Sequence, residues 1–114
     1  MPATMHMTRT CAVALLLLAA AALAPAAAQN AKIGRQKAQP CMVCHGQNGL
    51  STQPDAPSLA GQPALYLTTQ LQAYRSGDRR HETMAMMAKT LSDEDMANVS
   101  AWFASIKVEA HMPK

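Results

Sequence analysis

Residues 41–45 read Cys-Met-Val-Cys-His, and this motif constrains the chain more than any other feature. The Cys-x-x-Cys-His spacing is typical of covalent haem attachment, in which both sulfurs form thioethers with the haem vinyl groups. The histidine that follows directly, His45, is then tethered under the iron and is a candidate proximal ligand. The motif therefore predicts one c-type haem held by Cys41 and Cys44.

Other interpretations of the motif carry less weight. A structural zinc site normally takes four ligands, and downstream of the motif the chain offers only the scattered His81 and His111. A thioredoxin-like redox pair requires a βαβ scaffold, and no strands are predicted downstream. A chance occurrence is disfavoured because few five-residue patterns are this specific.

The first residues predict export. Residues 11–24 form an apolar stretch that follows Arg9, is too short to span a bilayer and precedes the small residues 26–28. We therefore expect residues 1–28 to be a cleaved signal peptide and residues 29–114 to form one periplasmic domain. The alternative, an uncleaved membrane anchor, is disfavoured by the short apolar segment and the small-residue site after it.

Charge indicates no special class of partner. Without Arg9, nine Lys and Arg residues stand against seven Asp and Glu, which leaves a charge of +2. Two ionised haem propionates would bring the surface close to neutral. Neither a nucleic acid nor an acidic membrane surface is therefore indicated as a partner.

The mature chain has little material for a hydrophobic core. Its aromatic residues are Tyr66, Tyr74, Trp102 and Phe103. Domains this small rarely bury enough apolar surface to be stable without a cross-link or a cofactor. A flat apolar macrocycle bonded at two cysteines would supply both the missing core and a staple.

Helix signals dominate the first part of the mature chain. Residues 31 to about 39 form a short polar helix candidate, which Pro40 should end with a bend. Residues 46–62 are rich in Gly, Pro and polar residues, which favours an irregular loop around the haem edge. Residues 63–76 predict a second helix, with proline in its first turn and Gly77 as a left-handed stop. The apolar stripe of this helix is Leu67, Leu71 and Tyr74.

The last helix carries the clearest signals. Ser92 is placed to cap it, and the acids at residues 93–95 complement its positive end. Its apolar residues repeat at helical spacing: Met96, Val99, Phe103 and Ile106. Since no period-two alternation is long enough for a sheet, the domain is predicted to be all-α.

Residues 81–87 lie between the two longer helices and offer a second iron ligand. A thioether from Met84, Met86 or Met87 could reach the open face of an iron already held from the other side. Methionine is also ordinary core filler, so periodicity alone does not choose among the three. His81 could bind instead, which would give a bis-histidine site with a lower potential.

Several further motifs follow the haem motif in a specific order. They are Cys41-x-x-Cys44-His45-Gly46, Pro57-Ser-Leu-Ala-Gly61-Gln62, Tyr66-Leu-x-x-Gln70-Leu71, Arg75-Ser-Gly77 and Met84-x-x-Met87-Ala88-x-x-Leu91-Ser92-Asp93-Glu94-Asp95. With this set the chain resembles the class I c-type cytochromes, close to the small periplasmic bacterial type whose haem domains also occur as pairs in dihaem cytochromes. The resemblance covers nearly all of residues 31–110. It implies the class I cytochrome c fold, with three to five short helices wrapped around one covalently bound haem.

The resemblance also implies roles for individual residues. It places covalent haem on Cys41 and Cys44, the proximal ligand at His45 and the distal sulfur at Met84. It also implies that the carbonyl of Pro57 accepts a hydrogen bond from the proximal imidazole and so orients the ring. Without the resemblance, Pro57 would indicate only a plain turn.

The resemblance further implies a close crossing of the first and last helices, with Gly34 opposite Trp102. The alternative is a fraying helix start and an unrelated surface ring. Met86 and Met87 would be packing residues. Two departures from the family pattern, Pro40 and the methionine at position 86, leave the end of the first helix and the distal loop less constrained.

The implied function is one-electron transfer to and from redox partner proteins, a membrane-bound oxidase or reductase among them. Neither an enzymatic activity nor a small-molecule substrate is expected, because no nucleophile-base pair, paired carboxylates or phosphate loop is visible. Two other hypotheses stay open: a haem-bearing, electron-accepting subunit of a periplasmic dehydrogenase or oxidase complex, and a five-coordinate haem that binds gas or peroxide. The basic residues near Met84 could guide an acidic partner or form a solvated face: Arg75, Arg79, Arg80 and Lys89.

Overall fold

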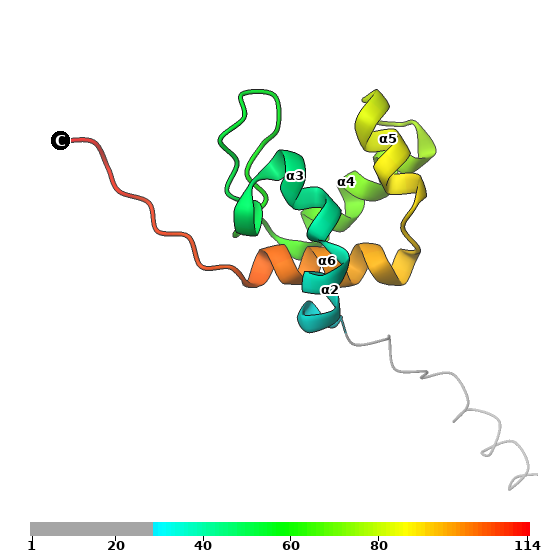
Figure 1. Ribbon diagram of the computed structural model, residues 1–114, viewed down its shortest axis with the longest axis horizontal. Helices are drawn as coiled ribbons and strands as arrows, with labels where there is room; N and C mark the ends of the chain where they lie inside the picture. The colour runs from blue at the N-terminus through cyan, green and yellow to red at the C-terminus, as the bar shows by residue number, and fades with distance from the viewer. Residues whose placement is uncertain (1–28) are drawn as a thin grey trace, which may run out of the picture.

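The computed structural model describes residues 29–114, and over this range the fold is all-α (Figure 1). The α-helices are α2 (Ala31–Lys37), α3 (Met42–His45), α4 (Ala64–Ser76), α5 (Glu82–Lys89) and α6 (Asp93–Ser105). Two 3₁₀ turns, Gln39–Cys41 and Gln47–Gly49, flank α3. The predicted fold class is therefore confirmed. The predicted signal peptide, residues 1–28, lies outside the described residues.

Helix α6 packs against both α2 and α4 (Figure 1). The side chain of Ser92 caps it by accepting a hydrogen bond from the Asp95 amide at 3.0 Å, as predicted. The predicted apolar stripe is buried at Met96, Val99 and Phe103. Ile106, the fourth member of that stripe, lies beyond the last turn but still packs against the same core.

Helix α2 crosses α6 at Gly34, where the two backbones nearly touch. A Cβ atom on Gly34 would lie 1.8 Å from the carbonyl oxygen of Asn98 and 3.0 Å from Cβ of Trp102. The predicted crossing is confirmed, although the closest atom belongs to the Asn98 backbone and not to the indole ring. The amide of Asn30 also donates to Asn98 Oδ1 at 2.7 Å, which joins the start of α2 to α6.

The end of α2 and the start of α4 differ slightly from the prediction. Helix α2 ends at Lys37, and the expected bend at Pro40 takes the form of the 3₁₀ turn Gln39–Cys41. Pro63 occupies the N-cap of α4 instead of its first turn, because its ψ of 133° is not helical. Gly77 ends α4 in the left-handed conformation, with φ of 90°, as predicted.

No local sequence signal predicts helix α5, whose residues lie in the stretch expected to connect the two longer helices. It packs on α4, and α4 also packs on α6 (Figure 1). Its N-cap is His81, whose side chain accepts a hydrogen bond from the Met84 amide. A helix of eight residues is marginal by itself, so its packing on α4 and its cap stabilise it.

Candidate haem-binding site

The two motif cysteines lie on consecutive turns at the start of the fold. Cys41 ends a 3₁₀ turn and Cys44 lies in α3, so their spacing of three residues places both thiols on one side of the chain. Neither is in a disulfide, and both line the same cavity. Cys44 is exposed, whereas burial raises the pKa of the Cys41 thiol above its ordinary value.

His45 is the last residue of α3 and is 8% exposed. Its Nδ1 lies 2.7 Å from the carbonyl oxygen of Pro57. Because a carbonyl only accepts, Nδ1 carries the proton and donates it, which leaves Nε2 with a free lone pair for a metal. The contact therefore determines both the tautomer and the orientation of the ring.

A glycine directly after His45 makes this contact possible. Gly46 has φ of 82°, and a Cβ atom there would lie 2.0 Å from the carbonyl oxygen of Leu50. The chain therefore turns sharply after α3, and the loop that follows returns along the cavity. This turn brings Pro57 within reach of an imidazole twelve residues earlier.

The three methionines of residues 81–87 lie on two different faces of α5. Met84 and Met87, three residues apart and so on one helix face, line the cavity. Met86 is 60% exposed and does not line it, so the packing role implied for this residue is wrong. His81 lies at the cavity as well, at the start of the helix.

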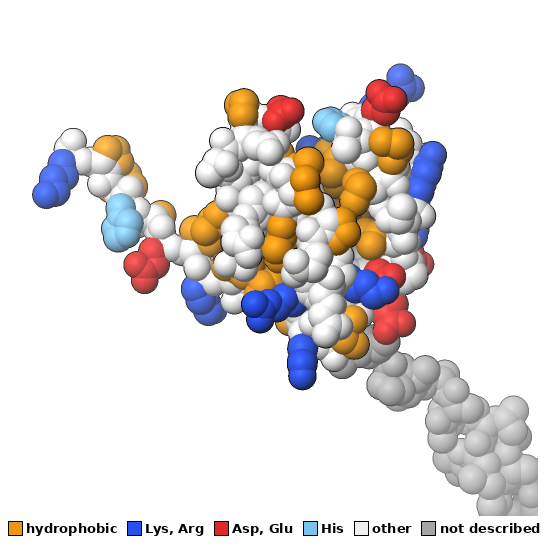
Figure 2. Space-filling view, in the orientation of Figure 1, with side chains coloured by type: hydrophobic (Ala, Val, Ile, Leu, Met, Phe, Trp, Pro, Cys, Tyr) orange, Lys and Arg blue, Asp and Glu red, His pale blue; other side chains and the backbone are white. Residues whose placement is uncertain are grey.

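His45 on α3 and Met84 on α5 both line a cavity of about 400 Å³, a size ordinary for a cofactor pocket. Its apolar lining includes Leu59, Tyr66, Leu67, Leu71, Tyr74, Leu91, Val99 and Phe103. Figure 2 shows apolar side chains along the middle of this face, between the α3 side and the α5 side. An imidazole, a thioether, two thiols and apolar walls together are a donor set that fits haem.

The cavity lining also includes polar residues to which the sequence assigned no role. They are Gln53, Asp55, Ser58, Gln62, Gln70 and Thr83. Gln62 and Gln70 stand in the ordered motifs that follow the haem motif, and this was the available signal for them. Of the basic residues near Met84, Arg75 pairs with Asp93, and Arg79 donates to Gln70.

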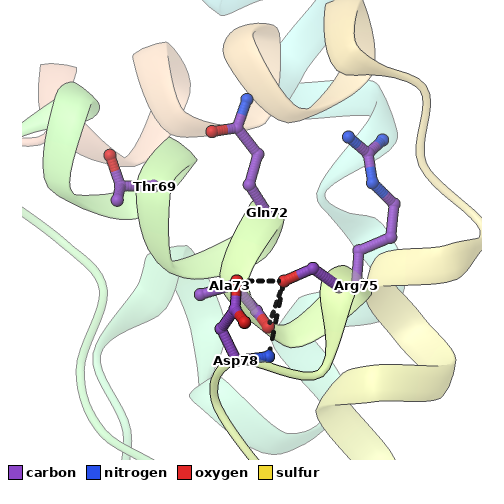
Figure 3. Close-up of a pocket in the computed structure, with 6 residues that line it drawn as sticks. Thr69, Gln72, Ala73, Arg75 and Asp78 are labelled. Atoms are coloured by element: carbon purple, nitrogen blue, oxygen red, sulfur yellow. Dashed lines mark hydrogen bonds between the residues drawn. The ribbon is translucent and has the colours of Figure 1, made fainter.

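A second hollow, of about 440 Å³, lies at the C-terminal end of α4 (Figure 3). It is lined by Thr69, Gln72, Ala73, Arg75, Ser76 and Asp78. The hydroxyl of Ser76 lies 2.8 Å from Asp78 Oδ2 and 3.2 Å from the carbonyl oxygen of Ala73. The lining of this hollow shares no residue with the cavity that His45 and Met84 line, so the hollow is not part of the candidate site.

The zinc site and the thioredoxin-like redox pair would each need structural elements that the described residues do not provide. Between residues 29 and 114, no three side chains of the His, Cys, Asp and Glu types gather into a metal-binding group. The same range contains no strand from which a βαβ scaffold could be built. None of its helices has the length and apolar character needed to cross a bilayer.

Comparison with known proteins decides what kind of site this is. The family model described as Cytochrome c matches residues 31–107. The chain belongs to the cytochrome c family. This cytochrome c domain is 41% identical over 81 residues to cytochrome c-554(548) of Halomonas halodenitrificans, a match that covers 68% of this chain and 98% of that protein.

Solved structures agree with this assignment. Reduced recombinant cytochrome c4 from Pseudomonas stutzeri matches with a TM-score of 0.66 and 37% identity, over 70% of this chain and 47% of that one. The thiosulfate dehydrogenase TsdBA from Marichromatium purpuratum matches with a TM-score of 0.67 and 33% identity, over 76% of this chain and 21% of that one. The chain thus spans nearly all of cytochrome c-554(548) but less than half of the two proteins of known structure.

Membership confirms the predicted resemblance and the predicted cofactor. The cytochrome c family implies a covalently bound c-type haem with its iron, and residues 41–45 fit the attachment motif. Members of the family are electron carriers rather than enzymes.

Proposed function

We propose that this cytochrome c domain is a periplasmic protein that carries single electrons on one covalently attached, His/Met-ligated haem. In this proposal Cys41 and Cys44 form the thioethers, His45 and Met84 are the axial ligands, and Pro57 orients His45. When bound, the haem supplies a one-electron ferric/ferrous couple.

The observation that carries the proposal is the 2.7 Å contact between His45 Nδ1 and the Pro57 carbonyl, with Met84 lining the same cavity. Pro57 holds the imidazole with its Nε2 lone pair available, and burial limits the motion of the ring. A thioether opposite that imidazole favours the reduced state relative to a second imidazole. The apolar walls disfavour the extra ferric charge, which raises the potential further.

In this scheme the protein has no catalytic group and binds no substrate. Side chains of the chain itself would supply both iron ligands, His45 and Met84, which would leave no coordination position for a reactant. The partners would then be redox proteins that dock near the cavity mouth, a membrane-bound oxidase or reductase among them.

The ligand assignment is tested by the weak far-red absorption band that sulfur-to-iron ligation produces in the oxidised state. We expect the wild-type protein to show this band and Met84→Ala to lose it. Met86→Ala is a matched control, because this side chain points away from the cavity and the band should persist. Met87→Ala should also keep the band, and its loss in either control would mean that the assignment to Met84 is wrong.

Carbon monoxide separates the proposal from a five-coordinate haem that binds gas or peroxide. With His45 and Met84 both ligated, the reduced protein should resist this ligand at neutral pH. Rapid and complete carbon monoxide binding by the wild type would favour the five-coordinate alternative instead.

The proposed periplasmic location is tested at the N-terminus of the protein. If residues 1–28 are a signal peptide, the protein recovered from a periplasmic fraction should begin at Gln29. N-terminal sequencing measures this directly, and an intact start at Met1 in the membrane fraction would indicate an anchor.

A second candidate function is supported by the likeness to the thiosulfate dehydrogenase TsdBA. The domain would then be the haem-bearing, electron-accepting subunit of a periplasmic dehydrogenase or oxidase complex, with the same haem site. Affinity purification of the tagged chain from its native periplasm distinguishes the two. A stoichiometric enzyme partner would support the subunit, and recovery of the haem protein alone would support the free carrier.

A further inference from the structure

We infer that His81 is a positioning residue for the distal ligand: its imidazole holds the first turn of α5, and with it Met84, at the haem cavity. The inference rests on the proposed function, in which Met84 ligates the iron. His81 acts through the backbone of Met84 and not as a ligand itself.

The contact that carries the inference joins the two residues directly. His81 has an extended backbone, with φ of −167° and ψ of 118°, and occupies the N-cap of α5. Its Nδ1 accepts a hydrogen bond from the amide of Met84 at 3.3 Å. The proposed ligand is therefore the residue whose backbone the cap restrains, on a helix too short to be stable alone.

The imidazole is in turn held against α4. Tyr74 meets the His81 ring edge-on, with centroids 6.3 Å apart and planes at 75°. The guanidinium of Arg79 lies 4.7 Å from the centre of the Tyr74 ring and donates to Gln70 Oε1 at 2.6 Å. Tyr74 and Gln70, both on α4, thus hold the segment that precedes α5. The position of Met84 therefore depends on a series of side-chain contacts that begins on this longer helix.

The same hydrogen bond argues against His81 as the distal ligand. A neutral imidazole carries one proton, and accepting at Nδ1 requires that proton to be on Nε2. Nε2 then has no lone pair for a metal, and Nδ1 is already engaged. The geometry therefore assigns the ring to capping and leaves ligation to the thioether.

The experiment measures how easily free imidazole displaces the methionine sulfur from the oxidised holoprotein. Displacement requires α5 to open, so the apparent affinity for imidazole reports the open population. His81→Ala removes the cap and should raise this affinity about fivefold, as expected from a typical N-cap. The titration follows loss of the far-red band.

Ser92→Ala is the matched control. Ser92 is the N-cap of α6, and its hydroxyl accepts a hydrogen bond from the amide of Asp95, the third residue of that helix, just as His81 does from Met84. Helix α6 carries no proposed iron ligand. Ser92→Ala should lower global stability without changing imidazole affinity. His81→Asn should restore the wild-type affinity, because asparagine is a good N-cap acceptor and fits the same bond.

The outcomes separate this inference from the proposed function. If Met84→Ala keeps the far-red band, Met84 is not the ligand and both proposals fail. If Met84→Ala loses the band but His81→Ala binds imidazole no better than Ser92→Ala does, only the positioning role is overturned. Failure of His81→Asn to restore the affinity would likewise contradict the capping mechanism.

Discussion

Gly34 lies where α2 crosses α6, and replacing it with alanine tests whether this crossing holds the fold together. The residue is buried within a helix and has no left-handed backbone, so alanine is compatible with its conformation. Taken alone, the change should stabilise α2 by about 1 kcal/mol, since alanine is a better helix former than glycine. Any destabilisation must therefore come from the contact with α6.

The structure predicts a large steric effect. The new Cβ atom would lie 1.8 Å from the Asn98 carbonyl oxygen, whereas ordinary contacts begin at 3.4 Å, so the helices must separate by about 1.6 Å. That shift strains the core by about 3 kcal/mol and weakens the bond from the Asn30 amide to Asn98 by about 1 kcal/mol. With the helix gain subtracted, we expect a net loss of about 3 kcal/mol.

Guanidinium unfolding of the holoprotein, followed by far-UV circular dichroism, measures this loss as a lower midpoint at an unchanged slope. Gly77→Ala is the control, because a Cβ there meets nothing within 4 Å and only the φ of 90° is strained. It should cost about 1 kcal/mol. If Gly34→Ala is as stable as Gly77→Ala or more so, the close crossing does not limit the stability of the fold.

Three further substitutions test other parts of the structure. Ser92→Ala should lower the free energy of unfolding by about 1 kcal/mol through loss of the α6 cap, measured by the same denaturation. Phe103→Ala should cost about 4 kcal/mol, because the ring is 1% exposed in the core; a loss below about 1 kcal/mol would contradict that packing. A hydrogen bond from Lys37 holds the pKa of Asp95 below its ordinary value near 3.8. The stabilisation by ionised Asp95 is therefore fully present above the unfolded-state pKa and is lost as pH falls through the lower pKa of the folded state. Asp95→Asn should therefore remove this contribution to the pH dependence of the free energy of unfolding at acid pH, as measured by denaturation at a series of pH values.

Local signals predicted the helices that carry their own start and stop residues. Ser92 reaches the amide of Asp95 three residues away, and Gly77 adopts its left-handed φ within a single turn. Both interactions are complete within one helical turn, so they can be recognised from neighbouring residues. Helix α5 could not be predicted in this way, because its cap, His81, is not a common N-cap residue. The rest of its stability comes from packing on α4, which no local pattern shows.

For the candidate site as well, the sequence predicted some features and the structure was needed for others. The Cys-x-x-Cys-His motif, with the order of the later motifs, predicted the haem, its attachment residues and the family. Helical periodicity could not show which methionines face the cavity, and the resemblance implied only that Met84 does. The structure turns Met84 and Met87 inward and Met86 to solvent. That choice depends on the rotation of α5 about its own axis, which the contacts with α4 determine.

The amino-acid sequence by itself thus determined the chemistry of this protein: two thiols and an imidazole in adjacent positions, on a small all-α chain. No local sequence pattern shows the 2.7 Å contact of Pro57 with His45, the approach of Gly34 to Asn98 or the inward face of α5, which form only in the tertiary structure. The family resemblance implied the His45 contact and the helix crossing, but not the atoms that meet at Gly34. The physical reason is distance along the chain. Covalent attachment and helix caps act between near neighbours, whereas these contacts join segments that meet only after loops close and helices pack.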